Sequence, residues 1–363
     1  MQLTKYKLGD LIVQRREKNK NYDVPIRGVS KEGFIKPKQQ EADTSIYNVF
    51  YRNDFVFNPA RMELNSIALN LEFDKALCSS LYEVFYVKDE SIVLPEYLNL
   101  HIKREEFARY CDYIGLGSAR EYCRFANISG YEIYLPSIDK QQEIVEADRL
   151  IKRRIHLNEQ MIQNLEATAQ ALYRKMFVDG IDKENLPEGW RMGTLGWVAE
   201  CYDYMRRPLA GYDRIDMEKK YPYYGAASLM DFVDDYLFDG TYILMGEDGT
   251  VINDDNTPVI QYVTGKFWVN NHAHILKGIN GFNENLLYLA LKQTKVNEYI
   301  TGGVQAKINQ ENMISIPLLI PTMDDLKEIT TNIEPLFHAM LMKKQENEKL
   351  TELQSLLLAM MGQ

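Results

Sequence analysis

The sequence YEIYLPSIDKQQEIVEA (Tyr131–Ala147) is echoed further along the chain by IPLLIPTMDDLKE (Ile316–Glu328). Each copy holds a short apolar run that ends at a proline, and a long stretch of helical character follows it. The two prolines, Pro136 and Pro321, stand 185 positions apart. Repetition over this distance predicts two copies of one folding unit, each closed by a long helix.

The echo extends upstream of this phrase. KLGDLIV (Lys7–Val13) resembles TLGWVAE (Thr194–Glu200) at a shift of 187. Three further pairs share the shift of 185, namely Gly117 with Gly302, Asn127 with Asn312 and Ile133 with Leu318. We therefore expect an α/β fold, in the broad α+β sense, with an internal pseudo-two-fold repeat.

Local patterns inside each copy mix strands and helices. The runs YNVFY (Tyr47–Tyr51) and YILMG (Tyr242–Gly246) are rich in aromatic and β-branched residues, which favours strands. Glu96–Cys111 and Glu284–Ile300 have apolar residues at helical spacing, which predicts one helix in each segment.

An apolar seam runs along each long helical stretch. Alternating steps of four and three residues from Ile144 to Met176 meet ten positions, of which eight are apolar. Similar steps from Leu326 to Met361 meet eleven positions, of which eight are apolar. This period is typical of a coiled coil. Because a domain lies between the helices, we expect an antiparallel coiled coil with the two domains at its ends; a helix packed on its own domain is the alternative.

Polar residues mark the register and the start of these helices. Asn158, Lys343 and Asn347 interrupt the seams, and buried polar positions of this kind can fix register. Thr322 and Asp325 have the spacing of a capping box at the start of the second helix. A helix of this length, about 40 residues, would extend roughly 60 Å.

The repeat divides the 363 residues into four consecutive segments. These are a first domain (1–137), a central long helix (138–178), a second domain (179–322) and a distal long helix (323–363). The N-terminus lacks the apolar stretch of a signal peptide, and no window approaches about 18 uninterrupted apolar residues. The four cysteines form no CxxC pair. We therefore expect a cytoplasmic protein with reduced thiols, no metal site and no membrane contact.

The charge of the chain is unevenly distributed. The net charge is −10, and residues 178–322 hold 12 basic against 20 acidic side chains. Arg15–Lys38, in contrast, holds eight basic residues against three acidic ones. Because phosphate binding depends on local basic patches, an acidic total does not exclude nucleic acid as a partner.

Three further segments resemble one known family. LPEGW (Leu186–Trp190), DFVFNPARM (Asp54–Met62) and GSAREYCRFANISGYEIYLPSIDKQQEIV (Gly117–Val145) resemble the specificity subunit of type I restriction–modification systems. The resemblance covers nearly the whole chain. There are two departures: the first domain lacks an LPEGW-like entry, and Lys140-Gln141-Gln142 is matched by Asp325-Leu326-Lys327.

The resemblance implies a non-catalytic, DNA-binding subunit of a host-defence complex. In that family two target-recognition domains each read one half of a bipartite double-stranded DNA site, and the helices set the spacing and dock two methyltransferase subunits. Restriction/translocase subunits complete the assembly. The resemblance therefore implies no cofactor in this chain, with S-adenosylmethionine, ATP and Mg²⁺ bound by the partner subunits.

The residues themselves also argue against catalysis by this chain. Asn58-Pro59 is followed by Ala60 rather than by the second proline of an adenine methyltransferase loop, and Gly265-Lys266 lies outside a phosphate-binding P-loop. His272 and His274 would share one face of a strand, but two ligands do not make a metal site. The alternatives are a divergent DNA adenine methyltransferase and a coiled-coil adaptor without sequence-specific binding.

Cationic, amide and aromatic side chains are the candidates for DNA contact, since Arg and Lys anchor phosphates and Arg, Asn and Gln read base edges. For each of them the alternative is a solvated side chain or a core aromatic. In the first domain the phosphate-facing candidates are Arg15, Arg16, Lys18, Lys20, Arg27, Lys31, Lys36 and Lys38, and the base-reading candidates are Arg61 and Arg120. In the second domain the candidates are Tyr204, Arg206, Arg207, Lys219, Lys220, Tyr221, Tyr223, Tyr224, Lys266, Asn270, Asn271, His272, Gln305 and Lys307.

Overall fold

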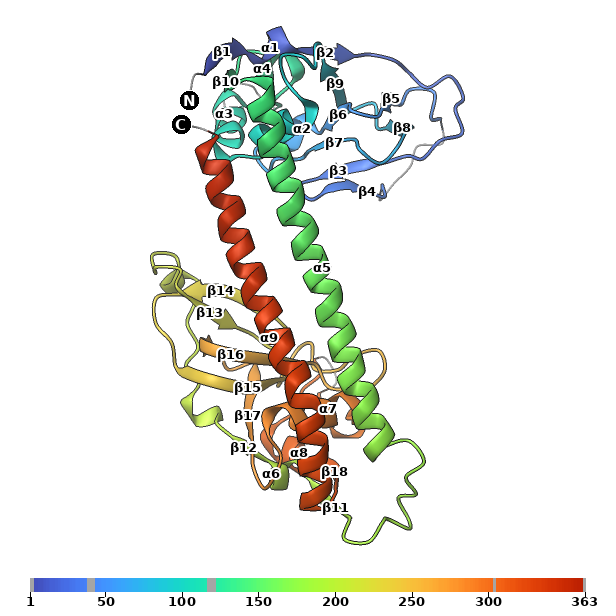
Figure 1. The fold of residues 1–363 in the computed structure, drawn as a ribbon, viewed down its shortest axis with the longest axis vertical. Coiled ribbons are helices and arrows are strands. Elements are labelled where there is room, and N and C mark those ends of the chain that lie inside the picture. The colour runs from blue at the N-terminus through green and yellow to red at the C-terminus, as the bar shows by residue number, and fades with distance from the viewer. Residues whose placement is uncertain (1–2, 38–42, 116–121, 303–304, 362–363) are drawn as a thin grey trace. The chain divides into compact units, whose positions relative to one another are not determined.

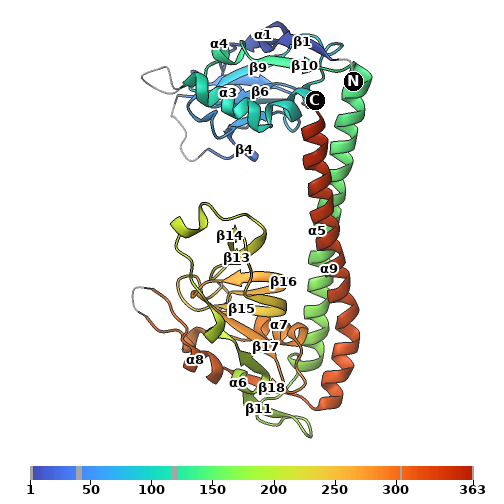
Figure 2. The same ribbon diagram turned by 90° about the vertical axis from the view of Figure 1, so that its left-hand side faces the viewer.

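The structure, a computed structural model, describes residues 3–37, 43–115, 122–302 and 305–361 (Figures 1 and 2). Its contacts divide the chain into two compact units, and each is described by itself. Unit 1 comprises Met1–Leu157 and Glu346–Gln363, and unit 2 comprises Asn158–Gln345. Each unit therefore takes in part of both long helices.

Unit 1 is built from short antiparallel strands with helices beside them. Its largest sheet has the order β2-β9-β6-β7, formed by Ile12–Arg15, Glu83–Val87, Phe55–Phe57 and Ile67–Leu69. Three strand pairs accompany it: β1 (Thr4–Lys7) with β10 (Glu132–Leu135), β3 (Gly28–Ser30) with β4 (Gly33–Ile35), and β5 (Asn48–Tyr51) with β8 (Lys75–Cys78). The helices are α1 (Leu8–Leu11), the 3₁₀ turn η1 (Pro59–Arg61), α2 (Pro95–Ile102), α3 (Glu105–Gly115) and α4 (Phe125–Ile128). The register of β6 on β9 stacks the rings of Phe55 and Phe85 in the core, with centroids 4.7 Å apart.

Unit 2 is organised around a six-stranded sheet with the order β12-β17-β15-β16-β13-β14. The strands are β12 (Ala199–Cys201), β13 (Tyr221–Tyr224), β14 (Leu229–Val233), β15 (Phe238–Gly246), β16 (Ile260–Val269) and β17 (Ala273–Gly278), and only the β13–β16 pair among the described strands is parallel. A separate pair joins β11 (Arg191–Thr194) to β18 (Pro317–Ile320). The helices are α6 (Leu195–Val198), α7 (Glu284–Gln293) and α8 (Gln310–Ser315), with 3₁₀ turns η2 (Asp203–Met205), η3 (Tyr212–Arg214) and η4 (Asn297–Tyr299). The six consecutive residues from Leu286 to Leu291 of α7 are all buried, as in a helix covered on every side.

The repeat predicted from the sequence is present in the backbone pairing. Lys7 pairs with Glu132 in unit 1, and Thr194 pairs with Pro317 in unit 2, so the register reproduces the shifts of 187 and 185. The next residue along each chain segment, Leu8 or Leu195, donates its backbone N–H to a carbonyl at a distance of 2.8 Å. The equivalent backbone positions of the two units are therefore built alike.

A glycine in each unit explains why the resembling segments keep LG. A Cβ atom on Gly9 would lie 2.9 Å from the Cβ of Ser129, and one on Gly196 would lie 3.0 Å from the Cβ of Ile314. Both contacts join the first turn of helix to the segment before β10 or β18. The absence of a side chain is therefore required at both copies by a close approach of the backbone.

Two long helices follow the repeated strands: α5 (Ile138–Phe177) after β10, and α9 (Met323–Met360) after β18. In unit 1 the start of α5 lies against the end of α9, because Gln354 donates a hydrogen bond to Asp148 (2.6 Å) and Arg154 forms an ion pair with Glu346 (2.6 Å). As the residue number rises on one helix it falls on the other. The two segments are therefore antiparallel in this unit.

In unit 2 the end of α5 and the start of α9 share one apolar core. Ala169, Tyr173 and Phe177 are buried with Ile329 and Ile333 in the same cluster. Domain residues of unit 2 join that cluster, and Tyr288 of α7 donates a hydrogen bond to Glu166 of α5 (2.6 Å). The seam positions thus pack on the neighbouring domain as well as on the other long helix.

The start of α9 has the predicted capping box. The backbone N–H of Asp325 donates to the hydroxyl of Thr322 (3.2 Å), and the N–H of Thr322 donates back to the Asp325 carboxylate (3.3 Å). Trp190 of the LPEGW segment donates its indole N–H to the same carboxylate (2.8 Å). At the start of α5, Lys140 stands in the position of Asp325. The buried amide of Gln141 holds this end of the helix by donating to the carbonyl of Ile92 (2.9 Å) and accepting from the N–H of Leu94 (3.0 Å).

Two helix predictions were wrong in extent. The segment Glu96–Cys111 contains two helices, because α2 ends at Ile102 and α3 begins at Glu105. Lys103, at the break, donates from Nζ to three backbone carbonyls, those of Lys31, Asn65 and Ile67. The second segment is α-helical only to Gln293, since Thr294 has an extended backbone, and the 3₁₀ turn η4 follows separately. Such tertiary hydrogen bonds outweigh the local apolar spacing.

Among the helices that the structure describes, none is long and apolar enough to cross a membrane.

Candidate nucleic-acid interface

Arg15, the first of the basic candidates, is held inside unit 1. It donates two hydrogen bonds to the carboxylate of Asp54 (2.6 and 3.0 Å), and its guanidinium lies between the rings of Tyr51 and Tyr86, 4.8 and 4.6 Å from their centroids. Burial raises the pKa of Asp54 despite this partner. Arg15 therefore stabilises the domain and does not extend toward a DNA backbone.

Two further candidates of the first domain are partly used by their own backbone. Lys18 donates from Nζ to the carbonyl of Ile46 (2.9 Å). Arg27 donates to the carbonyl of Ile26 (2.9 Å) and lies over the ring of Phe73, 4.7 Å from its centroid. These contacts orient the two side chains, but a carbonyl does not neutralise their charge.

The remaining cationic candidates that the structure describes in the first domain are accessible. Arg16, Lys20, Lys31, Lys36 and Arg61 are all exposed. Lys31 and Arg61 also line a cavity of about 550 Å³ together with Lys103. Burial lowers the pKa of Lys103 to about 8, so its ammonium is less firmly protonated than that of an ordinary lysine. Two candidates, Lys38 and Arg120, lie outside the described residues.

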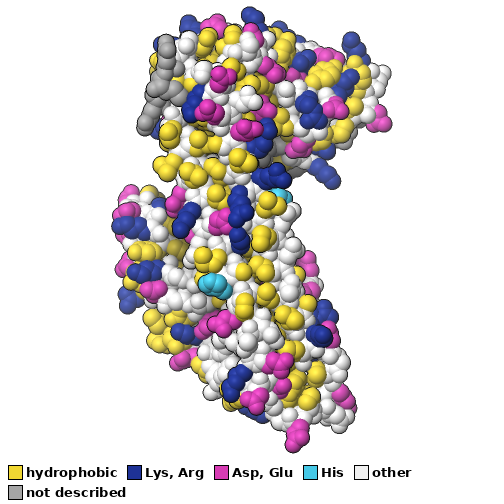
Figure 3. Space-filling model, in the orientation of Figure 1, with side chains coloured by type: hydrophobic (Ala, Val, Ile, Leu, Met, Phe, Trp, Pro, Cys, Tyr) yellow, Lys and Arg dark blue, Asp and Glu magenta, His cyan; other side chains and the backbone are white. Residues whose placement is uncertain are grey.

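Two neighbouring lysine candidates of the second domain are paired with acids, whereas Arg207 and Lys266 have other contacts. Lys219 forms an ion pair with Asp231 (3.1 Å), and Lys220 forms one with Glu218 (2.6 Å). Figure 3 shows basic and acidic side chains interspersed on the face that it draws of each unit. Arg207 is exposed and offers its backbone carbonyl to the indole N–H of Trp268 (2.6 Å). Lys266 lies over the ring of Tyr236, 4.4 Å from its centroid.

The aromatic candidates separate into core and surface. Tyr223 is buried, and its hydroxyl accepts the backbone N–H of Leu209 (3.0 Å), so it supports a loop and offers no surface. Tyr224 and Tyr221 are half-buried. Tyr204 is 78% exposed and is the tyrosine candidate most available for stacking.

The amide candidates lie beside the start of β17. Asn270 is buried and its side-chain oxygen accepts the backbone N–H of His272 (2.8 Å), so it shapes the turn. Asn271 and Gln305 are exposed. His272 is exposed and its Nδ1 lies 2.6 Å from Asp248. The prediction that His272 and His274 share a strand face was wrong, because β17 begins only at Ala273 and His274 is buried.

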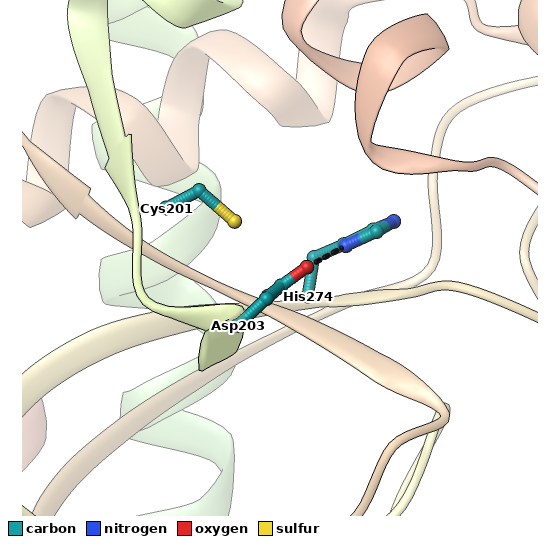
Figure 4. Close-up of side chains that lie close together, drawn as sticks. All are labelled: Cys201, Asp203 and His274. Atoms are coloured by element: carbon teal, nitrogen blue, oxygen red, sulfur yellow. Dashed lines mark hydrogen bonds and ion pairs between the residues drawn. The ribbon is translucent and has the colours of Figure 1, made fainter. Parts of the chain in front are cut away.

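Unit 2 also contains a cluster of charged residues around His274 of β17. The carboxylate of Asp203 meets His274 Nδ1 at 2.6 Å, as Figure 4 shows, and it accepts the backbone N–H of Ile275 (3.0 Å). Arg206 forms ion pairs with both Asp203 (3.3 Å) and Glu247. Lys307 reaches the other oxygen of Glu247 (3.2 Å). Arg206 and Lys307, both DNA candidates, are therefore partners of buried or half-buried carboxylates.

The pKa shifts in this cluster have one physical cause in common. Burial acts to raise the pKa of Asp203, but the hydrogen bond and charge of His274, with the charge of Arg206, hold it below its ordinary value. Burial acts in the same way on Glu247, and the hydrogen bond from Arg206 with the charge of His274 lowers its pKa. Both carboxylates are therefore ionised, and their cations are fixed beside them.

Cys201, Asp203 and His274 are the group in the described chain whose ligand atoms come close enough to suggest a metal, within 4.8 Å of one another. The donor set does not fit one. Both ring nitrogens of His274 are already bonded, to Asp203 and to the carbonyl of Ile308 (2.8 Å). Burial raises the pKa of the Cys201 thiol to about 12, which keeps it protonated. The sequence did not reveal this group, because His274 lies 71 residues from Asp203 along the chain.

Comparison with known proteins gives the family. The family model described as "Type I restriction modification DNA specificity domain" matches the chain twice, over residues 3–167 and 187–352. A putative type I restriction enzyme specificity subunit of Haemophilus influenzae, S.HindORF215P, is 31% identical over 157 residues, which is 42% of this chain and 39% of that protein. The type I restriction enzyme HindI specificity subunit of the same organism is 33% identical over 91 residues, 24% of this chain and 20% of that protein. The matched regions thus span less than half of either relative.

The fold agrees with that comparison. The crystal structure of a type I restriction–modification system S subunit from M. genitalium matches 99% of this chain and 96% of its own, with a TM-score of 0.56 and 14% identity. At this identity the match shows a shared fold. The resemblance noted in the sequence is confirmed: the chain belongs to the type I restriction–modification DNA specificity family and carries two of its specificity domains.

Proposed function

We propose that this chain is the non-catalytic specificity subunit of a cytoplasmic type I restriction–modification complex. Its two domains each read one half of a bipartite double-stranded DNA site, and α5 and α9 set the distance between the halves. The observation that carries the proposal is the duplicated frame: two family matches, with two sets of strand pairs in equivalent register.

The helices are suited to act as a spacer. In unit 1 their contacts are antiparallel, and in unit 2 they share the core of the domain. α5 has 40 residues and α9 has 38, and a helix rises about 1.5 Å per residue, so each extends roughly 60 Å. A stiff connection of this length makes the gap between half-sites depend on helix length and leaves the bases read by each domain unaffected.

Chemistry on the DNA falls to partner subunits in this proposal. Methylation of a base requires that the base be extruded from the duplex into a catalytic pocket. Two methyltransferase subunits would bind S-adenosylmethionine, and restriction/translocase subunits would bind ATP and Mg²⁺. This chain would contribute selection of the sequence, spacing of the half-sites and a docking surface.

Footprinting of the assembled complex on its methylated sequence motif tests the proposal. We expect two protected blocks whose bases are specified, separated by a gap of fixed length whose bases are not. Uniform protection without base preference would favour a coiled-coil adaptor. Binding of S-adenosylmethionine by the purified chain alone would favour a divergent methyltransferase.

A further inference from the structure

His274 lies at the centre of a set of charged residues that we call the charge network: Asp203, Arg206, Glu247 and His274. The side chain of His274 is 1% exposed. Its Nδ1 lies 2.6 Å from the Asp203 carboxylate, and its Nε2 lies 2.8 Å from the backbone carbonyl of Ile308. Both ring nitrogens therefore face an oxygen at hydrogen-bonding distance.

A neutral imidazole cannot satisfy both of these oxygens. It carries hydrogen on one nitrogen and a lone pair on the other, whereas a carbonyl and an ionised carboxylate only accept. Protonation of Asp203 would remove the conflict, but the pKa of Asp203 is lowered and Arg206 lies beside it. The remaining arrangement is an imidazolium that donates from both nitrogens.

In that state the charge network itself holds two cations, His274 and Arg206, and two carboxylates, with Lys307 as a further cation at the rim. Asp203 and Glu247 are the acidic groups, with Glu247 3.9 Å from Nδ1, and Arg206 pairs with both. Cys201 faces the same site with a protonated thiol, and Lys307 pairs with Glu247 at the rim. A buried charge is tolerated when it is paired and hydrogen-bonded. Loss of one His274 ring proton would leave a ring lone pair facing either the Asp203 carboxylate or the Ile308 carbonyl.

The network connects four segments that are distant in sequence. They are η2, the residues after β15, the start of β17 and the loop before α8, and the last of these is held by the Ile308 carbonyl. Five exposed DNA candidates lie within a few residues of these attachment points. We call them the recognition rim: Arg207, Asn271, His272, Gln305 and Lys307.

We propose that His274 is a positioning residue for reading of the second half-site, carrying hydrogen on both ring nitrogens and fixing the recognition rim through the charge network. The proposal rests on the proposed DNA-reading function of the second domain. It predicts a specific state of one side chain, which can be measured without DNA.

The first test is nitrogen NMR of the full chain labelled with [¹⁵N]histidine. At neutral pH we expect one of its five histidines to show a directly bonded proton on both ring nitrogens, and we expect that signal to be absent in His274→Gln. In Asp203→Asn the side chain keeps its shape but can donate to Nδ1, so His274 should change to a single proton on Nε2. A bare nitrogen on His274 in the wild-type chain would overturn the proposal.

The second test measures half-site preference in the assembled complex. His274→Gln should lower the preference for the matched over the mismatched second half-site by about tenfold, which is within the range that one well-read base pair contributes. Preference at the first half-site should not change, and neither preference should change in His338→Gln, whose exposed side chain on α9 lies outside the network.

The outcomes separate this inference from the function on which it rests. A wild-type complex that discriminates neither half-site contradicts the proposed function. A wild-type complex that discriminates both, together with His274→Gln and Asp203→Asn complexes that do the same, contradicts the positioning role alone. Should His274→Gln fail to fold, the wild-type spectrum and Asp203→Asn still decide.

Discussion

One pair of lysine candidates in each domain can be compared, and the two pairs differ in their acidic partners. In the first domain Lys31 and Lys36 are exposed, and no carboxylate of the described residues lies within ion-pair distance of either ammonium. In the second domain Lys219 and Lys220 each form an ion pair with an acid. The strand pairs that both domains share therefore determine where the loops begin, but they do not determine whether a loop lysine has an acidic partner. Phosphate attraction should come mainly from the first domain, and the second should depend more on positioned polar groups.

The largest expected effect is a loss of stability when a cation that is paired with acids in the second domain is removed. Arg206→Ala leaves Asp203 and Glu247 without their shared cation. Removal of one partner from a buried pair ordinarily costs about 3–5 kcal/mol, and because Asp203 keeps His274 and Glu247 keeps Lys307, the loss should be at the lower end, about 3 kcal/mol. We expect denaturant unfolding to show a loss of this size. The neighbouring Arg207→Ala is the control and should change stability by less than about 0.5 kcal/mol, as exposed substitutions do. Equal stability of the two variants would contradict the structural role of Arg206.

A second prediction concerns the buried histidine of the first domain. Burial lowers the pKa of His101 to about 4, so folding releases a proton when the pH lies between about 4 and the ordinary value of 6.5. The unfolded chain binds more protons in that window, so stability rises with pH across it, by about 3 kcal/mol for a shift of this size.

His101→Met should remove that part of the pH dependence. The measurement is the free energy of unfolding of wild type and variant at pH 4, 5, 6 and 7. The control is His338→Gln, which replaces an exposed histidine and should keep the wild-type slope. A variant whose stability still rises as steeply as that of the wild type would show that His101 is not the group responsible.

The smallest expected effect is a change in the salt dependence of DNA affinity, which compares the lysines of the two domains directly. Each cation that contacts a DNA phosphate contributes about 0.9 to the slope of log affinity against log salt concentration. We expect Lys31→Gln with Lys36→Gln to make the slope of the assembled complex shallower. The matched pair Lys219→Gln with Lys220→Gln should leave it nearly unchanged, because those ammonium groups already have acidic partners. Equal changes in the two double variants would remove the distinction.

The sequence predicted what depends on local pattern and on repetition. The apolar seams and the strand before each long helix follow from spacing that occurs twice in the chain, and the Thr322–Asp325 capping box follows from a local motif. The equivalent positions Gln141 and Leu326 are both buried, although one is an amide and the other apolar. Equivalent positions of the repeat are therefore buried alike, whereas the contacts that each side chain makes depend on the surrounding loops.

The candidate site was less predictable for a physical reason. Arg15 and Arg206 look like DNA-binding residues in sequence, but Asp54 lies 39 positions from Arg15 and Glu247 lies 41 positions from Arg206. The other partner of Arg206, Asp203, is near it in sequence and almost equally near Arg207. Nothing local distinguishes them from the exposed Arg16 and Arg207. The role of His274 likewise depends on Asp203 and Ile308, which only the fold brings to its two nitrogens.

The most direct test of the central claim, that the paired helices set the distance between two readers, is the methylation motif of cells that carry a lengthened spacer. One heptad is inserted after Leu157 in α5 and one after Gln345 in α9, so that the seam stays in register. Seven residues add about 10.5 Å at 1.5 Å per residue, or about 3 base pairs at 3.4 Å each. The control is a seven-residue insertion after Lys183 in the exposed loop that follows α5. The account predicts a gap lengthened by about 3 base pairs with both half-sites unchanged, and an unchanged gap or altered half-site bases would contradict it.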